Sequence, residues 1–244
     1  MSRSLHLILL LGMHLALGGI TAAQGAGRYL RVALEVKGSG APYQLYPAGR
    51  DGLFLVWQAA DDPSHSPGHW VVQFYDAGLL PRWKMALDGP QDASLVKAFV
   101  EDGSLHMLLT GKAGGGMNDA VVARIGVTEG DTSSHRFIAS SRNNPYFFSR
   151  LGDGYLLAAG NRAFESEITL LGQDGSILRP DIGLADQHWL DDAVWDPEAR
   201  EIIMVFKHRE SRKSHGLVVM ALDDRGQRKM RIDLTEDRGR WPSA

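Results

Sequence analysis

Residues 61–69 (DDPSHSPGH) form the part of the chain whose residue types could bind a metal ion. Carboxylates and imidazoles are ligands for divalent cations, and this segment supplies Asp62, His65 and His69. Its two prolines leave it without regular secondary structure, so the spacing of these ligands fixes no geometry. The sequence leaves a metal site and a solvated turn open as interpretations and favours the turn.

His188 and Asp192 are the candidate catalytic residues, because a carboxylate can orient an imidazole that acts as a general base. A hydrolase or lyase would combine this pair with Asp62 and His65. The alternative is that His188 packs beside Trp189 and that its ring nitrogens are satisfied locally. No G-x-S-x-G motif occurs in the chain, so the sequence leaves catalysis open and leans against it.

A third group of residues could bind a polar ligand. Lys207 and Arg209 begin the run 207–215 (KHRESRKSH), which carries more fixed positive than negative charge. Such a run could contact an anionic polysaccharide, a lipid head group or an acidic partner, or it is a solvated loop tip. Further hydrogen-bonding candidates on the same predicted face are Asn143, Asn144, Asn161 and Arg162.

The elements that must position these residues are short β-forming runs separated by tight turns. Asp-Gly between apolar runs is typical of a β-hairpin, because glycine tolerates a positive φ. The runs fall into four units of four strands each. The predicted strands are 43–47, 53–59, 70–75 and 80–87; 95–100, 105–110, 120–126 and 135–139; 145–151, 155–160, 167–172 and 177–184; and 192–195, 201–206, 216–222 and 229–234.

The register of the first turns indicates a repeat. Asp51, Asp102 and Asp153 are 51 residues apart, and the fourth turn begins at Asp196. A period of about 45–51 residues with four strands in each unit predicts an all-β, propeller-like fold. We expect four, possibly five, blades of four antiparallel strands, each packed on its neighbours. A sandwich or Greek-key barrel would not need this fixed step.

Two segments carry a resemblance to known propeller repeats. The units resemble generic β-propeller repeats in their order of strand, Asp-Gly turn, two apolar strands and outer strand. Residues 76–83 (DAGLLPRW) look like the D-x-x-G-x-x-x-W end of a quinoprotein-type blade, with the glycine one place early. This second resemblance implies, as a weaker hypothesis, a redox protein with a quinone-type cofactor. We otherwise predict no cofactor.

The N-terminal residues 1–23 have the pattern of a secretory signal peptide. Arg3 precedes a mainly apolar run at 5–17, and small residues follow up to Ala23. We expect cleavage near this point, one domain over 24–244, a periplasmic or secreted location and no stable membrane span. An uncleaved membrane anchor is the alternative. A strand predicted at 29–36 (YLRVALEV) is surplus to the four units, and it could close a ring, begin a fifth blade or pair with another subunit.

Composition narrows the functional classes. The chain has no cysteine, which excludes disulfides and thiolate chemistry, and its net charge of −3 gives no basis for nucleic-acid binding. We therefore predict an exported, non-catalytic protein that binds a protein partner or a polar or carbohydrate ligand through its loop face. The hydrolase or lyase remains the alternative.

Overall fold

The structure is a computed structural model, and it describes residues 43–59, 69–90, 92–112, 118–140, 144–160, 166–184, 188–209 and 215–235. The predicted signal peptide and the predicted strand at 29–36 lie outside these ranges.

The described chain folds into four antiparallel sheets of four strands, formed in chain order, and contains no helix. Sheet A comprises β1 (Gln44–Pro47), β2 (Gly52–Gln58), β3 (Trp70–Asp76) and β4 (Pro81–Leu87). Sheet B comprises β5 (Ser94–Glu101), β6 (Ser104–Lys112), β7 (Asn118–Gly126) and β8 (Thr132–Ser140). Sheet C comprises β9 (Asn144–Leu151), β10 (Gly154–Gly160), β11 (Ser166–Leu171) and β12 (Ile177–Leu178), and sheet D comprises β13 (His188–Asp196), β14 (Glu201–Arg209), β15 (His215–Asp223) and β16 (Arg228–Thr235). The all-β prediction and the four four-stranded units are confirmed.

The 51-residue step corresponds to the first hairpin of sheets A, B and C. In sheet B, Asp102 and Gly103 have φ values of 48° and 69°. Two successive positive φ values are typical of the type I′ turn, whose twist matches that of the flanking strands. The Asp-Gly pair at this position therefore forms the predicted hairpin.

The last strand of sheet C is shorter than the predicted strand 177–184, since β12 contains only Ile177 and Leu178. Pro180 lies two residues after Leu178 and has no N–H to donate to a neighbouring strand, so the chain leaves the sheet. Ile182 then packs in the core between sheets C and D, where it is 8% exposed. Ile182 is therefore a core residue that lies outside the strands.

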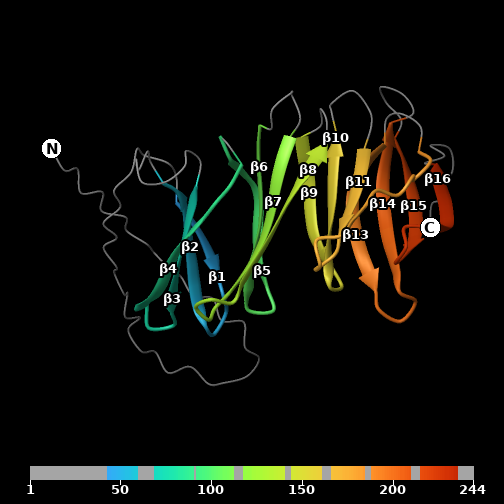
Figure 1. Cartoon of the computed structure of the whole chain (residues 1–244). Helices are drawn as coiled ribbons and strands as arrows, with labels where there is room; N and C mark the ends of the chain where they lie inside the picture. The colour runs from blue at the N-terminus through green and yellow to red at the C-terminus, as the bar shows by residue number, and fades with distance from the viewer. Residues whose placement is uncertain are drawn as a thin grey trace, which may run out of the picture.

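Hydrophobic cores join each sheet to the next one in the chain. Phe54 and Met107 lie between sheets A and B, Leu108 and Phe148 between sheets B and C, and Leu156 and Phe206 between sheets C and D. The sheets stand in a row, with sheet A and sheet D at its two ends (Figure 1). The first strands of successive sheets touch, as β1 contacts β5, β5 contacts β9 and β9 contacts β13.

Candidate functional site

The structure describes only part of the predicted site. Outside the described residues lie Asp62, His65, Asn143, Asn161 and Arg162. Asn144 begins β9 and Arg209 ends β14, but their side chains belong to the part of the chain that is not described. His69, His188, Asp192 and Lys207 can be located.

A β-bulge separates the two candidate catalytic residues. Leu190 pairs with Phe206 and Asp192 with Val205, so Asp191 is an extra residue in β13. Because side chains alternate between the faces of a strand, one extra residue reverses the face for everything after it. His188 therefore shares the face of Leu190, toward sheet C, whereas Asp192 lies on the opposite, exposed face. The structure does not bring this pair together.

The backbone on either side of Trp189 is held by two hydroxyl groups from sheet C. The Ser166 hydroxyl donates to the carbonyl oxygen of His188 at 2.6 Å, and the N–H of Leu190 donates to the Tyr146 oxygen at 2.9 Å. The two hydroxyls are themselves 2.9 Å apart. Since the only proton of Ser166 goes to the carbonyl, the Tyr146 hydroxyl must donate to Ser166. Two hydrogen bonds thus connect β9 and β11 to the first strand of sheet D, and a third links the two hydroxyls to each other.

This connection leaves neither hydroxyl proton available for chemistry. Burial raises the pKa of Tyr146, and the N–H that Leu190 donates to the phenol oxygen opposes that shift only partly. A phenol with a raised pKa stays protonated near neutral pH and cannot act as a base there, and a serine whose proton is held by a carbonyl is not activated as a nucleophile. We interpret Tyr146 and Ser166 as a clamp between sheets C and D.

The clamp holds an exposed aromatic side chain. The Trp189 and Tyr146 rings are stacked with centroids 3.5 Å apart and planes 21° from parallel, and Trp189 is still 40% exposed. Lys207 lies opposite Trp189 on β14, and its Nζ is 2.6 Å from an Asp191 carboxylate oxygen. Trp189 with this ion pair is the arrangement in the described chain that is best suited to hold a ligand.

His69 lies directly before β3 and is 5% exposed. Its carbonyl oxygen accepts a hydrogen bond from the N–H of Ala59 at 3.2 Å, which closes the base of the connection that contains residues 61–68. No group of three or more potential metal ligands occurs among the residues that are described. The predicted metal site therefore depends on Asp62 and His65, which lie outside them.

Trp83, which suggested a quinone-type cofactor, belongs to the core between sheets A and B. It lies in β4, the last strand of its sheet, and packs on Phe54 and Phe74 with ring centroids 6.0 and 5.7 Å away. Its indole N–H donates to the carbonyl oxygen of Val127 at 2.8 Å. Packing and this hydrogen bond account for the tryptophan at this position.

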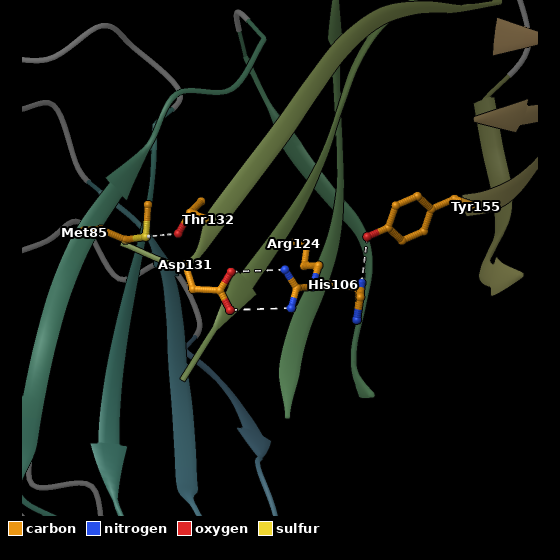
Figure 2. Close-up of polar contacts among 6 residues, drawn as sticks. All are labelled: Met85, His106, Arg124, Asp131, Thr132 and Tyr155. Atoms are coloured by element: carbon orange, nitrogen blue, oxygen red, sulfur yellow. Dashed lines mark hydrogen bonds and ion pairs between the residues drawn. The ribbon is translucent and has the colours of Figure 1, made fainter. Parts of the chain in front are cut away.

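Sequence reasoning did not identify a buried histidine between sheets B and C. His106 is 1% exposed and stacks on Phe99, and its Nδ1 is 2.8 Å from the Tyr155 hydroxyl, as Figure 2 shows. Burial is the main reason that the pKa of His106 falls to about 4, and the Arg150 and Arg124 charges lower it further. The sequence feature that could have identified His106 is its position inside the apolar run of β6, SLHMLL. A buried imidazole there is expected to need a hydrogen-bond partner.

Figure 2 also shows two further contacts of sheet B. Arg124 and Asp131 form an ion pair at 3.1 Å across the β7–β8 hairpin. The Thr132 hydroxyl lies 3.6 Å from the Met85 sulfur of sheet A. Both contacts are structural.

A comparison with known protein families finds no family model that matches this chain, and no curated protein matches it. Within the described ranges, no helix has the length and apolar character needed to cross a membrane.

Proposed function

We propose that the protein is an exported, non-catalytic binding module with a propeller-like scaffold, which holds a protein partner or a polar ligand at the loop end of its sheets. The observation that carries the proposal is the exposed Trp189, fixed by its stack on Tyr146. The proposal that the protein is exported is based on the signal-peptide pattern of residues 1–23.

Contacts between the sheets support the propeller-like scaffold. In radially arranged blades, the first strands surround an axis and touch one another in succession. Here β1, β5, β9 and β13 touch in that order, and sheets B and C bury apolar residues on both faces. The four sheets would then be blades in an arc.

A rigid aromatic side chain is an effective anchor for binding. Trp is enriched among the residues that dominate interface energetics, and a ring held in place before binding loses little conformational entropy. The stack on Tyr146 supplies this rigidity, and the Lys207–Asp191 pair supplies polar groups beside it. Trp189 and the Lys207–Asp191 pair could therefore bind either a polar ligand or a loop of a partner protein.

The catalytic alternative receives less support. A general base needs its carboxylate within hydrogen-bond reach, and Asp192 lies on the other face of β13 from His188. The Asp192 carboxylate also accepts a hydrogen bond from the N–H of Ala193 at 2.8 Å.

The test compares the mature chain, residues 24–244, with Trp189→Ala in affinity capture from the exporting cell and on a glycan array. We expect Trp189→Ala to weaken binding at least about thirtyfold, the loss typical of an anchor residue. Arg200→Ala is the control, because Arg200 lies at the opposite end of the same sheet, in an exposed ion pair with Asp224. Unchanged binding by Trp189→Ala, or turnover of a substrate that His188→Ala abolishes, would overturn the proposal.

A further inference from the structure

The outer face of sheet D, which points away from sheet C, is apolar across all four strands. Val194 pairs with Ile203, Val205 with Val219, and Val219 with Ile232. Residues that pair directly across antiparallel strands share one face, so these side chains form a continuous surface. The alternate residues, such as Phe206 and Met220, fill the core with sheet C instead.

This outer face is exposed to an unusual extent. Of the ten exposed large hydrophobic side chains among the described residues, six lie on it by register: Trp189, Val194, Leu217, Met230, Ile232 and Leu234. They are between 38% and 56% exposed. Contiguous apolar surface of this kind marks an interaction site, whereas single exposed hydrophobics do not.

The pattern of β16 is the reverse of that of a solvent-facing strand. A sheet that faces water normally presents polar residues outward and apolar residues toward the core. In β16, Ile232 and Leu234 lie on the outer face, while Arg231 and Asp233 point the other way. Arg231 reaches sheet C, where its guanidinium donates to the carbonyl oxygen of Gly183 at 3.4 Å. The last strand is therefore patterned as if a protein surface covered it.

We propose that the outer face of sheet D packs against the same face of a second copy of this chain, related by a two-fold axis. The equivalent face at the other end of the row does not offer a complementary apolar surface. On sheet A, Leu55, Trp57, Val71 and Tyr75 point away from sheet B and are all 7% exposed or less. Among the described sheet faces, the best match for the outer face of sheet D is the same face in another molecule.

The area of the face is compatible with this pairing. Four strands spaced about 4.8 Å apart, with about seven residues each rising about 3.3 Å, cover a face of about 450 Å². The relief of the side chains increases the surface buried, so two such faces approach the low end of stable interfaces, about 1,200 Å² in total. Five charged residues share the face by register, Asp192, Asp196, Glu201, Lys207 and Asp223, so the pairing relies on apolar contact and not on charge complementarity. Isologous pairs are the commonest oligomers.

The first experiment is sedimentation of the mature chain over concentrations from about 1 µM to about 200 µM, the range in which an interface of this size associates. We expect a monomer–dimer equilibrium, which Ile232→Asp weakens at least about tenfold because it buries a carboxylate without a partner. Ile177→Asp is the matched control. Ile177 is also exposed in the last strand of its sheet, at 41% against 44% for Ile232, but it belongs to sheet C.

Single cysteines supply a second measurement, because the chain contains none. Val205→Cys, Val219→Cys and Ile232→Cys, each made separately, sample the central row of the outer face. We expect at least one to give a covalent dimer on mild oxidation, while Leu178→Cys on sheet C does not. A monomer at every concentration overturns the proposal, and so does a dimer that Ile232→Asp and Ile177→Asp affect equally. Open-ended polymers would instead mean that sheet D packs on another face. Trp189 lies by register at the start of this face, but both measurements use the purified chain without a ligand, so the two proposals fail separately.

Discussion

At the scale of single residues, His106 links stability to pH. Its pKa is about 4 in the folded chain against an ordinary value of 6.5, mainly because burial disfavours the charged ring. The unfolded chain therefore takes up the proton first as the pH falls. The stabilisation from a neutral His106 is complete above pH 6.5 and is lost as the pH falls from 6.5 toward 4.

We expect the free energy of unfolding to fall by about 2 kcal/mol between pH 7.5 and pH 5 through this residue. Urea unfolding at both pH values measures it. His106→Phe keeps the stack on Phe99 but cannot be protonated, so it should lose this pH dependence while it leaves the Tyr155 hydroxyl without its partner. An equal pH dependence in His106→Phe and in the unmodified chain would show that His106 is not responsible.

At the scale of the elements, the first hairpin of sheet A depends on two glycines with different constraints. Gly52 has a φ of 138°, and a Cβ there would lie 1.9 Å from the carbonyl oxygen of Tyr75. Gly49 has a φ of 62°, and nothing lies within 4 Å of its Cβ position. One site combines a strained backbone with a collision against β3, whereas the other has the strain alone.

Gly49→Ala should therefore destabilise the protein by about 1 kcal/mol, the cost of a left-handed alanine. Gly52→Ala should cost about 3 kcal/mol or more, because strands β2 and β3 must also move apart. Thermal unfolding of the two variants measures the difference. Equal losses would mean that the pairing of β2 with β3 tolerates a side chain at position 52.

The turns could be predicted from the sequence because their chemistry is local. Asp76 shows why: its carboxylate accepts backbone N–H groups from Gly78 and Leu80 at 2.9 and 3.0 Å and pairs with Arg82 at 2.8 Å. Asp223 does the same with Arg225, Gln227 and Lys229. Residues within six positions make these contacts, so a short sequence window contains all of them.

The bulges could not be predicted, because a bulge is defined by the register of a partner strand. Val96, Tyr146 and Asp191 are each an extra residue near the start of the first strand of sheets B, C and D. The repeat of this feature is visible only in the paired strands. The extra residue Asp191 separates the predicted catalytic pair, because it places Asp192 on the opposite face of β13 from His188. The contact of Tyr146 with Trp189 likewise depends on how sheets C and D pack.

At the scale of the whole molecule, a row of sheets should differ in stability along its length. Each sheet packs only on its neighbours, so sheets B and C are held on two faces by hydrophobic cores and sheet D on one within the described chain. Opening of sheet D alone exposes one interface, whereas opening of sheet B or C exposes two.

Amide hydrogen exchange of the Ile232→Asp variant, in which the proposed dimer is weakened, should reveal this order. We expect the amides of β6 and β10 to exchange most slowly and those of β16 at least about tenfold faster, since tenfold corresponds to only about 1.4 kcal/mol. In the unmodified chain, β16 should gain protection as the concentration rises, because pairing of two sheets D would cover its outer face. Equal protection of β6 and β16 in the variant would mean that the row opens as one cooperative unit. In that case sheet D is held by more than its core with sheet C.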